Sequence, residues 1–256
     1  MCYDLSVSIK TQLFLAEEQS GTEVAQQLAL KLVPQTDLPL HHSSGFEHPT
    51  LLAYTQASPQ MPHVAQWGLI PPWAKDWLQA QQWRAKTLNA RGETMVSKPA
   101  FREAAQQFRC LIPVDGFFEH HHHQAKTYPY YIYARDASPL VLAGLASEWV
   151  DRETGEVLLT FSIVTTRGNA LLTKIHNNPK LAGPRMPVIL PPEQWHRWLD
   201  PALDLSYPTV LDSLLRSYPE EKLAAHTVAR LRGREYAGNL PSIKEPVAYE
   251  ALPNLS

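Results

Sequence analysis

The second residue of the chain is a cysteine, Cys2, which becomes the N-terminal residue if Met1 is removed. It then carries an α-amine and a thiol, with reference pKa values of about 8 and about 8.5, so part of each is nucleophilic near neutral pH. An aldehyde can condense with the amine to an imine, and the thiol can then close a thiazolidine ring. The alternative interpretation of Cys2 is a small buried residue at the start of a strand.

A second group of reactive residue types lies in the segment from Asn89 to Thr94, which also contains Arg91 and Glu93. An arginine can bind a phosphate through two parallel hydrogen bonds, and an asparagine can orient a nucleophile. A turn that leads into a helix needs similar residue types, so the segment alone leaves both interpretations open.

Glu119 ends an apolar stretch that begins at Cys110, and His176 follows a short helical segment. A carboxylate in that position is either a solvated turn residue or a buried acid with a raised pKa. The run His120–His123 fits a hairpin tip better than a metal site, because no acidic or thiol partner has ligand spacing nearby. We therefore expect no metal and no cofactor.

Exposed tryptophan beside lysine is one way in which proteins hold single-stranded nucleic acid. Trp73 and Trp77 flank Lys75 in a proline-rich loop that has this composition. The other interpretation is that both indoles cover the core under the loop.

The composition excludes several classes of protein. With 256 residues, 44% of them hydrophobic, the chain can bury a full core, and its net charge of −2 excludes a strongly basic face. Two cysteines argue against a disulfide framework and fit a reducing cytoplasm. The sequence has neither a signal-peptide pattern nor a long apolar run, so we expect a cytoplasmic protein without a membrane segment.

Hydrophobic periodicity predicts a mixture of strands and helices in one domain over residues 1–256, with an irregular tail at 238–256. Alternation over residues 3–9 predicts a strand that holds Cys2 at its leading end. Ser20 to Glu23 has capping-box spacing before a helix, and 34–50 reads as a loop with solvated histidines. Further strands are expected at 51–55, 63–70, 110–119, 128–133, 140–146, 157–165, 185–190 and 224–231, and further helices at 101–108, 169–174, 191–199 and 210–215.

The order of these motifs resembles the SRAP family, the SOS-response-associated peptidases also known as abasic-site processing proteins. The resemblance is strongest over residues 2–200. The motifs that carry it are Met1-Cys2, Trp67-Gly68-Leu69-Ile70-Pro71-Pro72-Trp73-Ala74, Asn89-Ala90-Arg91-Gly92-Glu93-Thr94, Cys110 to Glu119, Ile175-His176 and Arg185 to Leu190.

This resemblance implies an α+β fold, with a curved, barrel-like antiparallel β core, peripheral helices and a groove for single-stranded DNA. It implies a monomer that senses abasic sites in single-stranded DNA and cross-links to them covalently through its N-terminal cysteine. The chemistry is lyase-like imine formation, and the thiazolidine product shields the lesion. The implied catalytic residues are Cys2, Asn89, Glu119 and His176. The implied DNA-binding residues are Arg91, which contacts a backbone phosphate, and Trp67 and Trp73, which shape the groove or stack on bases.

The chain departs from the family pattern at two places near these residues. Many members begin Met-Cys-Gly-Arg, whereas Tyr3 and Asp4 stand here, so a basic residue near the nucleophile is lost. An additional segment, residues 177–184, separates His176 from Arg185.

Two other functions are compatible with the same residues. Cys2, activated by its own amine or by His176, can serve as the nucleophile of a cysteine peptidase that cleaves its own leader or another peptide substrate. Alternatively, Trp73, Trp77 and Arg91 bind single-stranded DNA without covalent chemistry, and Cys2 is structural.

Overall fold

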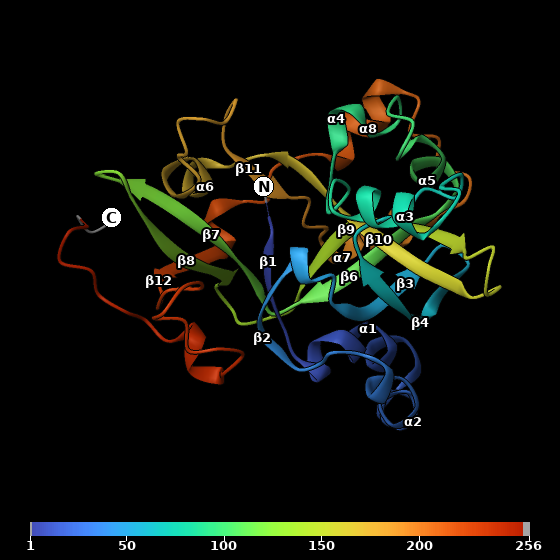
Figure 1. Ribbon diagram of the computed structural model, residues 1–256, viewed down its shortest axis with the longest axis horizontal. Helices are drawn as coiled ribbons and strands as arrows, with labels where there is room; N and C mark the ends of the chain where they lie inside the picture. The colour runs from blue at the N-terminus through green and yellow to red at the C-terminus, as the bar shows by residue number, and fades with distance from the viewer. Residues whose placement is uncertain (1, 253–256) are drawn as a thin grey trace.

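The computed structural model describes residues 2–252 and shows an α+β fold in which two β-sheets share one hydrophobic core (Figure 1). The expected removal of Met1 and the last residues of the expected tail, 253–256, lie outside the described residues.

The first sheet has five strands in the order β12-β8-β7-β1-β2, and all of its neighbouring pairs are antiparallel. Strand β1 passes through the middle of the molecule, where it pairs with β7 on one side and with β2 on the other (Figure 1). Its four residues are all buried, so the start of the chain is held firmly. The strands are β1 (Asp4–Val7), β2 (Leu40–Ser44), β7 (Gly116–His123), β8 (Lys126–Ala134) and β12 (Leu223–Thr227).

The second sheet closes on itself, because β9 pairs with both β6 and β10 and completes the ring β10-β4-β3-β6-β9. The short strands β5 and β11 extend it by pairing with β10. The expected barrel-like core is thus confirmed, although β4 and β5 pair with β10 in parallel. The strands are β3 (Thr50–Thr55), β4 (Ser58–Trp67), β5 (Asn89–Arg91), β6 (Arg109–Val114), β9 (Leu140–Val150), β10 (Val157–Arg167) and β11 (Arg185–Pro187).

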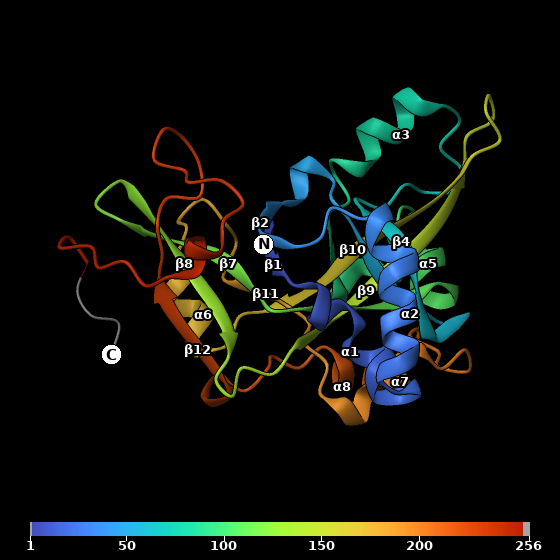
Figure 2. The same cartoon turned by 90° about the horizontal axis from the view of Figure 1, so that it is seen from below.

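Helices α1, α2 and α7 lie together along one side of the barrel (Figure 2). No helix of the described chain is both long and apolar enough to span a membrane. The helices are α1 (Ile9–Ser20), α2 (Thr22–Leu32), α3 (Trp77–Arg84), α4 (Gly92–Met95), α5 (Arg102–Gln107), α6 (Ala170–Ile175), α7 (Pro192–Leu199) and α8 (Pro208–Leu214), and short 3₁₀ helices lie at 33–35, 45–47, 220–222 and 241–244.

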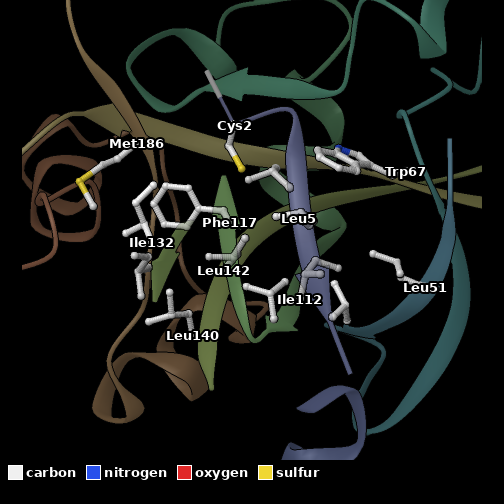
Figure 3. Packing of buried hydrophobic residues seen from close by; sticks show 14 of the residues in the cluster. Cys2, Leu5, Leu51, Trp67, Ile112, Phe117, Ile132, Leu140, Leu142 and Met186 are labelled. Carbon is white, nitrogen blue, oxygen red and sulfur yellow. The ribbon is translucent and has the colours of Figure 1, made fainter. Parts of the chain in front are cut away.

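Strands β3, β6 and most of β9 bury both of their faces, as is expected of barrel strands that are covered on both sides, whereas the first four residues of β4 are exposed or half-buried. In β3, Leu51 and Ala53 join the cluster that includes β1, whereas Leu52 and Tyr54 join the cluster under the helices. The first cluster, which contains Cys2, connects the two sheets (Figure 3). Both sheets therefore depend on one core, and Cys2 belongs to it.

The chain differs from the sequence-based expectation near its start. The first strand ends at Val7 and not at residue 9, because the Ser8 hydroxyl accepts a hydrogen bond from the backbone N–H of Thr11 and begins α1. The expected capping box at Ser20 is wrong, since α1 continues to Ser20 and Gly21 joins the two helices with a φ of 86°.

Candidate functional site

Cys2 precedes β1 and is fully buried in the core beside Leu5 and Phe117 (Figure 3). Its backbone carbonyl accepts a hydrogen bond from Nδ2 of Asn89 at 2.8 Å, and its Sγ lies 3.9 Å from the carbonyl oxygen of Asp4. Burial raises the pKa of the Cys2 thiol well above its ordinary value, and the charge of Glu119 raises this pKa further. At neutral pH the sulfur is therefore present as a thiol.

Strand β5 brings Asn89 to Cys2 by pairing with β10, where Asn89 lies opposite Ile163. The residue before it, Leu88, fixes this position, because its carbonyl accepts hydrogen bonds from the Trp67 indole at 2.8 Å and from the Ile163 N–H at 3.0 Å. Oδ1 of Asn89 is buried and has no hydrogen-bond partner among the described residues. An acceptor is thus available directly beside the start of the chain.

Glu119 in β7 and His176 after α6 form the second pair, with 3.6 Å between Glu119 Oε2 and His176 Nδ1. Burial raises the pKa of Glu119 to about 7, so its carboxyl is half protonated near neutral pH. Burial likewise lowers the pKa of His176 to about 4, so its imidazole is neutral there. Nδ1 of His176 also lies 3.0 Å from the carbonyl oxygen and 3.1 Å from the amide nitrogen of Arg185, which fixes the ring.

The two groups of this pair line a surface cleft of about 430 Å³. Tyr3, the neighbour of Cys2, forms part of its wall, and the charge of Glu119 raises the pKa of Tyr3 in addition to burial. The other residues that line the cleft are His120, His122, Thr127, Pro129, Asn178, Leu181, Arg230, Leu231 and Arg232.

A second pocket of about 430 Å³ contains three arginines, Arg91, Arg167 and Arg185. Arg185 is oriented by Glu93, with Nη1–Oε1 and Nη2–Oε2 distances of 2.7 and 2.9 Å. Leu181 lines both this pocket and the cleft of Glu119. The additional segment 177–184 therefore stands between the candidate acid–base pair and the arginines.

The two tryptophans of the expected DNA-binding set have different environments. Trp67 has no exposed surface and lies in the core, stacked on Phe161 with 6.3 Å between ring centroids. An indole without exposed surface cannot stack on a base, so of the two expected roles of Trp67 only the shaping of the groove is left, through the hydrogen bond to Leu88 that supports β5. Trp73 is 43% exposed and packs edge-on against Trp83.

A polar network around Asp4, at the start of β1, has no local signal in the sequence. Asp4 is buried, and its carboxylate lies 3.1 Å from Nε2 of His42 and 3.0 Å from Nη2 of Arg232. Nδ1 of His42 lies 2.8 Å from the Tyr236 hydroxyl. The expected solvated loop at 34–50 thus contains β2 and a buried histidine. Arg232 places a cation beside Asp4, which stands where many family members have an arginine.

The four consecutive histidines belong to β7, and the turn that follows them, Gln124-Ala125, has φ values of 48° and 61°. The hairpin predicted there is confirmed, with the histidines on the strand and not at its tip. Within residues 2–252, no cluster of three or more histidine, cysteine or acidic side chains has the arrangement of a metal site.

Comparison with known proteins assigns the chain to a family. The SOS response associated peptidase (SRAP) family matches residues 1–233. The abasic site processing protein YoqW of Bacillus subtilis is 39% identical over 65% of this chain and 68% of its own length, and the abasic site processing protein HMCES of Xenopus tropicalis is 30% identical over 64% and 51%. A crystal structure of a protein from Bacteroides thetaiotaomicron superposes with a TM-score of 0.82 at 34% identity, covering 96% of this chain and all of that one. The chain belongs to the SRAP family.

Proposed function

We propose that this protein captures abasic sites in single-stranded DNA by forming a covalent thiazolidine between the lesion aldehyde and Cys2, after Met1 has been removed. The observation that carries the proposal is the arrangement around Cys2: its carbonyl is held by Asn89, and the charge of Glu119 acts on its thiol. Relatives named abasic site processing proteins support the choice of substrate. The proposed role is the shielding of the lesion in the response to DNA damage.

Glu119 supplies and removes protons in this mechanism. The Cys2 amine adds to the aldehyde carbon, and Glu119 gives its proton to the carbinol oxygen, which leaves as water. The Glu119 carboxylate then takes the proton from the nitrogen, which yields the neutral imine and restores the carboxyl. The thiol then adds to the imine carbon while its proton passes to the nitrogen, so one aldehyde and one aminothiol yield one thiazolidine and one water. A carboxyl with a pKa of about 7 serves both as acid and as base near neutral pH.

The amine attacks first, because burial keeps the Cys2 sulfur as a thiol. The thiol then acts within the same residue, where proximity compensates for its low nucleophilicity. Asn89 positions the amine, since its Nδ2 holds the Cys2 carbonyl and its Oδ1 is a buried acceptor. His176, neutral at this pH, is the second proton-transfer group beside Glu119.

Recognition of the DNA relies on phosphates, since an abasic site lacks a base. Arg91 and Arg167 line the pocket next to the cleft and provide cations for the DNA backbone, whereas Arg185 in the same pocket is paired with Glu93. A chain with a net charge of −2 depends on such local groups for binding DNA.

A cysteine hydrolase fits this arrangement less well. Such an enzyme needs a thiolate, whereas burial and Glu119 both raise the pKa of the Cys2 thiol. The family description nevertheless includes peptidases, so the purified protein should also be incubated with a peptide in the absence of DNA.

Intact-mass analysis tests the proposal directly. The protein is measured alone, to establish whether Met1 is absent, and then after mixing with a single-stranded oligonucleotide that contains one abasic site. We expect a heat-stable adduct that forms without reductant, with a mass equal to protein plus oligonucleotide minus one water. Cys2→Ala, which packs into the same site, should give none. An equal amount of adduct in Cys2→Ala would contradict the proposal, and DNA binding without any adduct would favour the non-covalent alternative.

A further inference from the structure

Two arginines from the segment after β12 line the cleft of Glu119 and His176, on the other side of segment 177–184 from the pocket of Arg91. Both are attached to the body of the protein. The guanidinium of Arg230 donates a hydrogen bond to the Thr127 carbonyl and lies 5.4 Å and 5.6 Å from the ring centroids of Tyr128 and Tyr249. Such cation–π contacts hold the guanidinium plane in a fixed direction.

Arg232 is held in a different way. Its Nη2 lies 3.0 Å from both carboxylate oxygens of Asp4, whose side chain is only 4% exposed, whereas the Arg232 side chain is 57% exposed. The guanidinium has five N–H donors in a planar fork, and the contact with Asp4 occupies only one of its nitrogens. Asp4 therefore orients Arg232 and leaves the other donors toward solvent.

Asp4 pairs with Arg232 from the protein side, but the cleft itself has little further negative charge to neutralise the two arginines. Glu119 is the single acid among its described lining residues, and burial keeps that acid about half protonated at neutral pH. Glu235 lies 3.8 Å from Nε of Arg230, but its side chain is 78% exposed, so solvent screens this pair. The wall formed by Arg230 and Arg232 thus carries a local positive charge next to the candidate acid–base pair.

We propose that Arg230 and Arg232 form a second phosphate-binding position, which binds the backbone of single-stranded DNA on the side of segment 177–184 that faces Glu119. This inference rests on the proposed function, because it supplies the second half of the DNA path. The strand is then held by arginines on both sides of the segment, and the lesion is presented to Cys2 between them.

The salt dependence of binding to an undamaged single-stranded oligonucleotide tests this inference without any covalent step. Each phosphate contact contributes about 0.7 to the slope of log affinity against log salt concentration. The double variant Arg230→Gln/Arg232→Gln removes both cations. It should therefore make the negative slope shallower by about 1.4 and lower the affinity for the oligonucleotide by at least about tenfold. Fluorescence anisotropy at several salt concentrations measures both quantities.

Two control variants separate contact from general charge and from folding. Arg234→Gln removes an exposed arginine of the same segment that is not among the residues lining the cleft, and it should leave the slope unchanged. Asp4→Asn combined with Arg232→Gln keeps the net charge and replaces the ion pair by a neutral pair of similar shape, and it should still lower the slope by about 0.7. Slopes equal to that of Arg234→Gln in all of these variants would overturn the inference.

The outcomes for the two proposals are distinguishable. If the wild-type protein forms the adduct and the slopes do not respond to Arg230 and Arg232, only the second phosphate position is wrong. If the wild-type protein neither binds undamaged single strands nor forms an adduct, the proposed function itself is wrong.

Discussion

The proposed reactive centre and the arginine-lined surface around it differ in how the protein treats charge. At the centre, burial raises the pKa of Cys2 and Glu119 and lowers that of His176, so the neutral form of each group is favoured. At the surface, the side chains of Arg91 and Arg232 are exposed to water. Desolvation thus tunes reactivity in one region, and solvated cations provide binding in the other.

This contrast predicts that substitutions in the two regions affect different steps. Changes at the centre should slow adduct formation and leave binding to undamaged DNA intact. Changes at the surface should weaken binding and leave the rate at saturating DNA intact. A variant that reduces the rate of adduct formation and the affinity for undamaged DNA to the same extent would contradict this separation of roles.

The largest effect is expected from Glu119→Gln. The amide keeps the shape of the carboxyl but cannot transfer a proton, so adduct formation should slow by about 10²- to 10⁴-fold. Quenched time courses on an abasic oligonucleotide measure the rate, and anisotropy with undamaged DNA provides the control. Equal losses of rate and of affinity would argue against an acid–base role for Glu119.

The pH dependence of stability should reveal the buried pair itself. The pKa of Glu119 is raised to about 7 from 4.5, so its contribution to stability is lost as pH rises through 4.5–7. The pKa of His176 is lowered to about 4 from 6.5, so its contribution is lost as pH falls through 6.5–4. These windows overlap with opposite signs, and each contribution is at most about 3 kcal/mol, so they largely cancel in the wild-type protein.

Single substitutions should remove this cancellation. Glu119→Gln keeps only the His176 contribution, so the free energy of unfolding of this variant should fall relative to wild type as the pH is lowered from 7 to 4.5. His176→Asn keeps only the Glu119 contribution, so the free energy of unfolding of this variant should rise relative to wild type over the same decrease in pH. Urea unfolding at both pH values measures these differences, and parallel behaviour of all three proteins would show that the two groups are not buried as a pair.

A smaller effect is expected from Asn89→Asp, which is isosteric but removes the N–H that holds the Cys2 carbonyl. The loss of one such hydrogen bond is worth about 1–3 kcal/mol, equivalent to a factor of roughly 5 to 150 in the rate of adduct formation. Arg91→Gln is the matched comparison in the same strand, because it should change affinity and not the rate at saturating DNA. The idea that Asn89 positions Cys2 fails if the rates of the two variants are the same.

Local patterns in the sequence were sufficient to predict many of these elements. Strand alternation from Tyr3 onward indicated that Cys2 is held by a strand, and β1 does follow it. The pairs that the structure brings together, Asn89 with Cys2 and Glu119 with His176, come from motifs far apart in the chain. Their proximity was implied by the family resemblance and not by periodicity.

The network around Asp4 was not predictable for a related reason. His42 and Arg232 are 38 and 228 residues from Asp4, and neither residue is part of a local motif that points to the other. Strand β2 was also not predicted, because residues 34–50 are polar in composition. An edge strand that pairs on one side only and lies beside a buried carboxylate can form from polar residues. Burial of Trp67 shows the same limit, because tryptophans in one motif can face the core or the solvent.

The smallest effect is expected from Trp73→Ala, at the exposed edge of the molecule. Stacking of a base on an aromatic side chain is worth about 1–3 kcal/mol, and Trp73 already packs edge-on against Trp83 with under half of its surface exposed. We therefore expect the lower end of this range, a loss of affinity for undamaged single strands of about fivefold, with the rate of adduct formation at saturating DNA unchanged.

Leu78→Ala is the matched control for Trp73→Ala, because Leu78 is an exposed apolar residue of the adjoining helix α3 with 66% of its surface exposed. Both substitutions remove exposed apolar surface, but only Trp73 presents an aromatic face to a base. A fivefold loss confined to Trp73→Ala would place the DNA path over the loop before α3. Equal affinities of the two variants would restrict the binding surface to the arginines, because the exposed indole would then only cover the core beneath it.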